Sequence, residues 1–212
     1  MTDERVARGM RAQLERRRAL LDEGARPLGW KVGFNLPAAQ EQLEIDRPLA
    51  GFLTSAGLLE NGAEVPIGRG AIVEPEVAVE VGADARSIAA LLPALEIAHP
   101  PDLSQEVEEI LAGNIFHRGV AFGPRVETEA PGAARVLVNG EERRALGADA
   151  TRAHLPEMVE VIAERLAEAG EELRAGERII TGVLAPPPAA QTGDTVRLEL
   201  EALGAVELSF TA

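Results

Sequence analysis

Residues 73–82, Val-Glu-Pro-Glu-Val-Ala-Val-Glu-Val-Gly, alternate acidic and apolar side chains within an apolar stretch. Successive side chains of a β-strand point to opposite faces, so this alternation predicts a strand with one apolar face. Its other face carries Glu74, Glu76 and Glu80. Neighbouring carboxylates on a partly enclosed face repel each other and need a cation, a shared proton or full solvation. Hard divalent cations, which prefer oxygen ligands, are one way to meet that need.

A third acid, Glu96, lies in the apolar segment 91–98 on a different element. Because an unpaired carboxylate is costly to bury among Leu, Ala and Ile, Glu96 needs solvent or a partner. Glu74, Glu76 and Glu96 could therefore form a three-carboxylate site. An equally open alternative is a solvated edge strand, since a proline such as Pro75 within a strand pattern is typical of an edge whose wet face carries Glu.

The length and the pattern of elements limit the fold class. A chain of 212 residues can bury one substantial core, and we expect a single domain over residues 1–212. Apolar periodicity predicts an N-terminal helix near residues 3–23 and another from residue 155 to about 170. Short strands separated by glycines follow in 52–82, and strands return after residue 179. Without a repeating β-α-β order, this pattern favours an α+β fold.

Charge and cysteine content exclude several classes of function. The net charge of −14 argues against nucleic-acid and anionic-membrane partners, because phosphate binding needs a positive field. The chain has no cysteine, which excludes disulfides and thiolate chemistry. It shows neither a signal peptide nor an apolar run long enough for a membrane span, so we expect a cytoplasmic protein.

Short motifs follow one another along the chain. Residues 29–33 read Gly-Trp-Lys-Val-Gly, and residues 74–79 read Glu-Pro-Glu-Val-Ala-Val. Further motifs are Pro48-Leu49-Ala50-Gly51, Pro93-Ala94-Leu95-Glu96-Ile97, the segment 173–182 and Gly193-Asp194. In this order they resemble the 2-keto-4-pentenoate hydratases of the fumarylacetoacetate hydrolase superfamily, from about Gly29 to the C-terminus.

The resemblance implies a fold, a cofactor and a reaction. The fold would be the mixed β-roll or sandwich of the fumarylacetoacetate hydrolase C-terminal type over residues 28–212, with a short N-terminal helical segment over 1–27. Glu74, Glu76 and Glu96 would bind Mg²⁺ or Mn²⁺. The reaction would be that of a carbon-oxygen lyase of aromatic catabolism, in which water adds to a 2-hydroxy-2,4-dienoate. The substrate would be a small 2-oxo acid, and relatives commonly form homo-oligomers.

The resemblance also suggests catalytic and substrate-binding residues. Lys31, the only lysine, would bind the charged end of the substrate or transfer a proton, since a desolvated lysine can titrate near neutrality. A surface cation with a buried stem is the alternative for Lys31. Asn114, Thr181 and Gly182 would contact the substrate, although Asn114 and Thr181 could equally be turn or strand-end residues.

The chain departs from the family where many hydratases continue Glu-Ile with Val-Asp-Ser-Arg. Residues 98–101 read Ala-His-Pro-Pro, so an acid and an arginine are missing. His99 stands in the place of that Asp and is a candidate catalytic group. For His117 and His154 a surface or structural role is favoured over acid–base chemistry.

Three other functions fit the same carboxylates. They are decarboxylation of a 2-oxo diacid, hydrolytic carbon–carbon cleavage of an acylpyruvate, and non-catalytic binding of a small acid. Hydrolysis is disfavoured because no His-Glu pair that could activate water is evident near the N-terminus.

Overall fold

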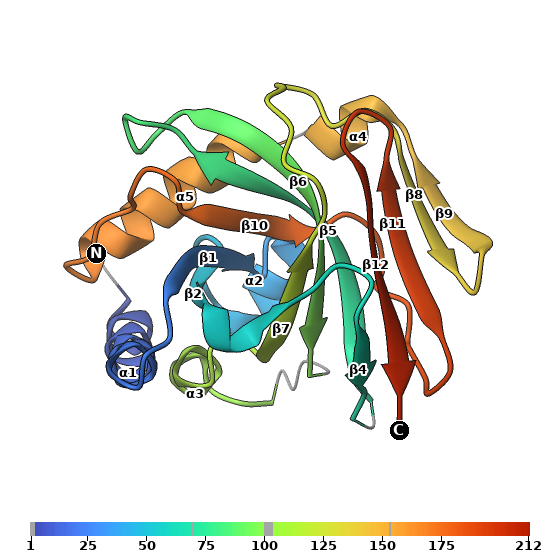
Figure 1. Cartoon of the computed structure of the whole chain (residues 1–212). Coiled ribbons are helices and arrows are strands. Elements are labelled where there is room, and N and C mark those ends of the chain that lie inside the picture. The colour runs from blue at the N-terminus through green and yellow to red at the C-terminus, as the bar shows by residue number, and fades with distance from the viewer. Residues whose placement is uncertain (1–2, 69, 100–103, 153) are drawn as a thin grey trace.

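The computed structural model describes residues 3–68, 70–99, 104–152 and 154–212. Its helices are α1 (Glu4–Asp22), α2 (Pro37–Leu43), α3 (Val107–Ala112), α4 (Ala148–Arg152) and α5 (Leu155–Glu168), with a 3-10 turn, η1, at Ser55–Gly57. None of these helices is long and apolar enough to cross a membrane. The strands form two mixed sheets that lie against each other (Figure 1).

The larger sheet has seven strands, which in spatial order are β2 (Leu49–Thr54), β1 (Pro27–Gly33), β10 (Arg178–Val183), β5 (Ile72–Val81), β6 (Ile88–Ala98), β7 (His117–Phe122) and β3 (Leu58–Leu59). The smaller sheet has five, in the order β4 (Glu64–Pro66), β12 (Gly204–Thr211), β11 (Thr195–Leu200), β8 (Ala134–Val138) and β9 (Glu141–Leu146). This arrangement confirms the α+β class and the two-sheet fold expected from the sequence.

The acidic strand β5 is the fourth of seven strands, so the edge-strand alternative is wrong. Pro75 is tolerated in this central position because it lies at the end of the β5–β10 ladder, whose last pair is Val183 with Glu76. The Pro75 carbonyl accepts a hydrogen bond from the Leu184 N–H at 2.9 Å, beyond that pair. The missing N–H of the proline therefore interrupts no continuous ladder.

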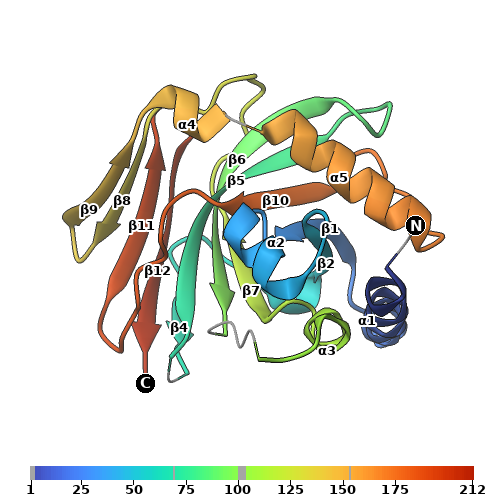
Figure 2. The ribbon, with the colours of Figure 1, turned by 180° about the vertical axis from the view of Figure 1, so that it is seen from behind.

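The two faces of the large sheet have different partners. On one face, apolar side chains of β5 and β6, such as Val77 and Leu95, join the main core with β11, β12 and the helix α5. Figure 2 shows α5 running along the outside of β10 and β1, against which it packs. The opposite face holds a smaller apolar cluster that includes Ala78, Leu92 and Ile180.

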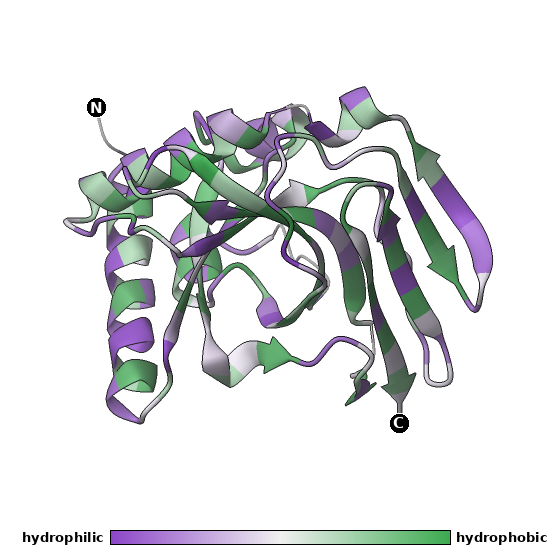
Figure 3. Cartoon of the chain, turned by 45° about the horizontal axis from the view of Figure 1, so that its top comes forward, coloured by the Kyte–Doolittle hydropathy of each residue, from purple (hydrophilic) through white to green (hydrophobic). Residues whose placement is uncertain are grey.

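Local sequence signals account for the elements at the periphery. The helix α1 begins at an Asp3 N-cap, whose carboxylate accepts from the Arg5 N–H, and packs on α3 at Gly9. Asn139 and Gly140 have φ values of 55° and 78°, which suit the tight two-residue turn that Asn-Gly favours between β8 and β9. Figure 3 shows hydrophobic and hydrophilic residues alternating along β11 and β12, as expected for strands with one buried face.

Candidate metal centre

Strand pairing brings the three predicted carboxylates together. Glu74 on β5 and Glu96 on β6 are direct cross-strand partners, and Glu76 lies two residues further along β5 on the same face. One oxygen from each lies within 4.8 Å of one from each of the others. Glu76 is 1% exposed and Glu96 is 0% exposed. The structure therefore places buried Glu76 and Glu96 beside half-buried Glu74, where solvation alone cannot fully relieve their repulsion.

Lys31 reaches the same cluster from β1, on the other side of β10. Its side chain is buried, and its Nζ donates to Glu96 Oε1 and to the Ile115 carbonyl at 3.2 Å. The stem of Lys31 lies across Gly51 of β2, where an added Cβ would come within 2.6 Å of the lysine Cγ. Gly51 therefore provides the space through which Lys31 reaches Glu96.

The pKa values of the Lys31–Glu96 pair favour the charged forms. Burial lowers the pKa of Lys31, but the charges of Glu96 and Glu74 outweigh it, so this pKa lies above its usual value. Burial likewise raises the pKa of Glu96, but Lys31 and His117 outweigh it and hold the pKa below its usual value. Burial therefore does not lower the pKa of Lys31 in this arrangement, and a role for Lys31 in substrate binding or proton transfer stays a prediction.

The two acids on β5 behave in the opposite way. Burial, reinforced by the charge of Glu96, raises the pKa of Glu74 to about 7. The pKa of Glu76 is raised well above its usual value by burial and by the charges of Glu96 and Glu74, against smaller lowering effects of the Lys31 charge and of the hydrogen bond from Gly182. Without a further cation, the metal-free site relieves its repulsion by taking up protons.

The residues fit a divalent cation. Glu96 Oε2 is buried and receives no hydrogen bond from any described donor. Glu74 could donate to it only when protonated. Three ionised carboxylates and one ammonium sum to a charge of −2, which a divalent ion would neutralise. An all-oxygen donor set of this kind suits Mg²⁺ or Mn²⁺.

His117 is a part of the site that sequence reasoning missed. Its Nδ1 lies 2.8 Å from Glu96 Oε1, and its side chain is 7% exposed. Counting back from Val120, which pairs with Glu96, strict alternation would turn His117 to the opposite face. A bulge between β6 and β7 leaves Arg118 unpaired, so His117 pairs with Ala98 and shares the face of Glu96.

Asn114 lies beside the cluster but turns its side chain to the protein backbone. Its Oδ1 accepts from the Phe52 N–H at 2.8 Å, and its Nδ2 donates to the Phe52 carbonyl at 3.0 Å. Asn114, Ile115 and Phe116 have φ values of 60°, 50° and 61°, an unusual left-handed turn for such residues. This turn aims the Ile115 carbonyl at Lys31, and a substrate contact for Asn114 stays a prediction.

The other predicted substrate-binding residues lie at the end of β10. Thr181 Oγ1 donates to the Val77 carbonyl at 2.9 Å, and the Gly182 N–H donates to Glu76 Oε2 at 2.6 Å. Gly182 has a φ of 97°, and a side chain there would strike Asn35. His99 is exposed and lines the same pocket as Gly182. Substrate contacts for these residues stay predictions.

A pocket of about 190 Å³ is lined by Glu74, Glu76 and Lys31. Most of its other lining side chains are apolar: Val32, Phe34, Leu36, Ala39, Ile72, Ala98, Ile115, Phe116 and Val183. Leu36 is 55% exposed, which is unusual for a large apolar side chain in this protein. The pocket therefore joins a buried charged end to an apolar wall that reaches solvent.

The fold and the carboxylate cluster define a class of α+β proteins with a candidate metal site on a mixed sheet. Residues 30–211 match the model of the family described as fumarylacetoacetate (FAA) hydrolase C-terminal, and the chain belongs to this family.

The chain is similar to several known proteins. It is 30% identical to 2-keto-4-pentenoate hydratase 1 of Dechloromonas aromatica (strain RCB) over 222 residues, 91% of this chain and 81% of that protein. It is 28% identical to a 4-oxalocrotonate decarboxylase of Pseudomonas sp over 208 residues, 90% of this chain and 81% of that protein. Its fold is similar to that of 4-oxalocrotonate decarboxylase from Pseudomonas putida G7, complexed with magnesium and adipate. The TM-score is 0.81 and the identity 23%, over 93% of this chain and 83% of that chain. The family thus includes hydratases and decarboxylases.

Proposed function

We propose that this chain is a hydratase that uses Mg²⁺ or Mn²⁺ to add water to a 2-hydroxy-2,4-dienoate, giving a 4-hydroxy-2-oxo acid. The observation that carries the proposal is the pocket, which combines Glu74, Glu76 and the buried Lys31 with a wall of mostly apolar side chains. A dienoate has the same polarity, with a carboxylate and an oxygen at one end and a hydrocarbon chain at the other. Several relatives are hydratases by name.

Glu74, Glu76 and Glu96 would hold the metal ion, and three protein oxygens leave coordination positions open for a substrate. When bound, the ion supplies a Lewis acid that stabilises negative charge on the 2-oxo acid head. The Gly182 N–H holds Glu76 in place, and Lys31 holds Glu96.

Lys31 has a further part in the proposed reaction. Its ammonium group has three hydrogens, of which two are used by Glu96 and the Ile115 carbonyl. The third is available to a substrate, because Lys31 also lines the pocket. We infer that this group binds the carboxylate of the substrate or hands over a proton during ketonisation.

Decarboxylation of a 2-oxo diacid is the second candidate, favoured by the relatives of that name. A diacid places a second carboxylate towards the pocket wall, where it needs a cation or solvent. Among the described residues that line the pocket, the basic side chains are Lys31 and His99, and His99 is exposed. The apolar wall therefore favours a substrate with an uncharged tail.

An ultraviolet assay tests the proposal. The purified protein is given 2-hydroxypenta-2,4-dienoate with Mg²⁺, Mn²⁺ or EDTA, and a 2-oxo-4-hexenedioate is assayed in parallel for CO₂ release. We expect metal-dependent loss of the dienoate, formation of the 4-hydroxy-2-oxo acid and little CO₂. Faster CO₂ release from the diacid would identify a decarboxylase. Metal binding without turnover of either would instead support a binding role.

Light scattering on the same sample tests the predicted homo-oligomer.

A further inference from the structure

The two oxygens of Glu96 have different surroundings. Oε1 receives hydrogen bonds from Lys31 Nζ and from His117 Nδ1, the latter at 2.8 Å. Oε2 is buried and receives none from the described residues. A carboxylate held on one oxygen in this way cannot rotate freely about its last bond. We propose that His117 is a positioning residue that, together with Lys31, holds Oε1 of Glu96 so that Oε2 alone faces the metal ion.

The ring of His117 is held in a defined orientation. Ionised Glu96 can only accept, so Nδ1 carries the hydrogen and donates. On its far side, Nε2 is buried with no hydrogen-bond partner among the residues that the structure describes, and it lies against η1, 3.2 Å from where a Cβ on Gly57 would stand. The β6–β7 bulge fixes the backbone at His117. Because Nδ1 is engaged by Glu96 and Nε2 faces Gly57, the geometry makes His117 a support for a ligand and not a ligand itself.

Glu76 shows the same arrangement built from the backbone. Its Oε2 accepts from the Gly182 N–H at 2.6 Å, which leaves Oε1 for a cation. Glu96 lies in the middle of β6, where its neighbours' N–H groups pair with β5 and β7. Lys31 from β1 and His117 from β7 therefore orient the Glu96 carboxylate, as the backbone N–H of Gly182 orients that of Glu76. Both buried acids would then bind through one oxygen each.

The inference predicts a loss of metal affinity when the donor is removed. Groups that hold a metal ligand by a hydrogen bond typically contribute a factor of about 10 to 100 to affinity. This claim depends on the metal centre and not on the reaction, so it can be tested whether or not the protein hydrates a dienoate.

The experiment compares two amides at one position. In H117N, the side-chain nitrogen takes the place of Nδ1 and keeps the donor to Glu96. In H117Q, the nitrogen lies near the place of Nε2, so the residue is polar and similar in size but lacks that donor. Mg²⁺ and Mn²⁺ affinities are measured by isothermal titration calorimetry, together with the electron paramagnetic resonance spectrum of bound Mn²⁺. The control is H154Q, since His154 is exposed and pairs with Glu157.

We expect H117N to bind metal within about threefold of wild type and H117Q to bind about 10- to 100-fold more weakly with an altered Mn²⁺ spectrum. H154Q should match wild type. Equal affinities for H117Q and wild type would overturn the inference. So would equal losses in H117N and H117Q, because His117 would then act only by filling space. If H117Q fails to fold, the H117N affinity decides, since a tenfold loss there contradicts a role for the Nδ1 donor.

Discussion

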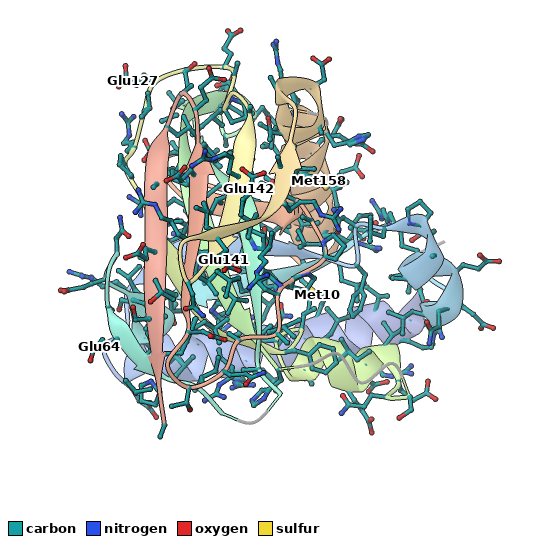
Figure 4. The ribbon with its side chains drawn as sticks, turned by 90° about the vertical axis from the view of Figure 1, so that its right-hand side faces the viewer. Met10, Glu64, Glu127, Glu141, Glu142 and Met158 are labelled. Atoms are coloured by element: carbon teal, nitrogen blue, oxygen red, sulfur yellow. The ribbon has the colours of Figure 1, made fainter. Side chains whose placement is uncertain are left out.

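Strands β5 and β9 both carry closely spaced glutamates: Glu74 and Glu76, with Glu80 further along, on β5, and Glu141 and Glu142 on β9. β9 is the edge of its sheet, and its two acids point into solvent (Figure 4). They form surface ion pairs, such as that of Glu141 with Arg143 at 3.1 Å. Similar residues thus occur in a solvated edge strand and in a buried central one.

The two strands differ in the groups that can pair with their acids. Exposed acids on β9 have water and flexible arginines, and such pairs contribute little to stability. The acids on β5 share their face with Glu96, Lys31 and His117, and burial makes each partner necessary. A buried acidic cluster indicates a site, because stability alone does not require it.

Removing one acid from each strand should produce the largest contrast. E76A takes a ligand from the centre, and we expect Mg²⁺ affinity to fall by more than the roughly 100-fold that loss of a supporting group causes. E142A on β9 should leave it unchanged. Calorimetric titration of both variants measures this, and unchanged affinity in E76A would remove Glu76 from the metal site.

Removing the cation that pairs with the buried acids, Lys31 of β1, and one from β9 is the next contrast. In the metal-free protein, K31M leaves Glu96 buried with only His117, and breaking such a pair typically costs about 3–5 kcal/mol of stability. R143M on the surface should change stability by about 0.5 kcal/mol or less. Urea unfolding in EDTA checks both values. A K31M protein as stable as wild type would mean that Glu96 is satisfied without Lys31.

The same variant separates catalysis from metal binding. With metal present, K31M should lower turnover about 100-fold, the range of acid–base or positioning groups. Its metal affinity should fall less, because Glu74, Glu76 and Glu96 all remain. Turnover equal to that of wild type would exclude Lys31 from the reaction.

The local sequence predicts much of the fold. Alternation identified β5, apolar periodicity identified α1 and α5, and Asn-Gly identified the hairpin between β8 and β9. These signals depend on neighbours in the chain. They do not state which strand pairs with which, so the central position of β5 and the cross-strand pairing of Glu74 with Glu96 required the structure.

The candidate site was also predicted only in part, because the sequence does not show how the strands pair. The carboxylates came from a motif and a resemblance, whereas His117 reaches Glu96 only through a bulge that reverses the alternation in β7. The apolar run of β6 contains Pro93 and shows no clear period, so the sequence did not identify it as a strand. Interactions that depend on register and bulges are set by tertiary packing.

The smallest expected effect is the pH dependence of metal binding at the buried site. Burial and the charge of Glu96 raise the pKa of Glu74 to about 7, so in the metal-free protein this acid holds a proton at pH 6 and has lost it at pH 8. Metal binding requires the carboxylate and must expel that proton. Mg²⁺ affinity should therefore rise about tenfold from pH 6 to pH 8, and more if Glu76, whose pKa is also raised, titrates in this range.

Calorimetry in buffers of different ionisation enthalpy measures the protons released, and at least about one per ion is expected at pH 6. The stability of the metal-free protein changes with pH in the opposite direction to its metal affinity. An acid whose pKa is raised on folding stabilises the folded state fully below its unfolded pKa, and this contribution is lost as the pH rises through 7. The metal-free protein should thus lose stability over the range in which it gains metal affinity. Affinity that does not change between pH 6 and pH 8 would show that Glu74 is already ionised and solvated, as the acids of β9 are.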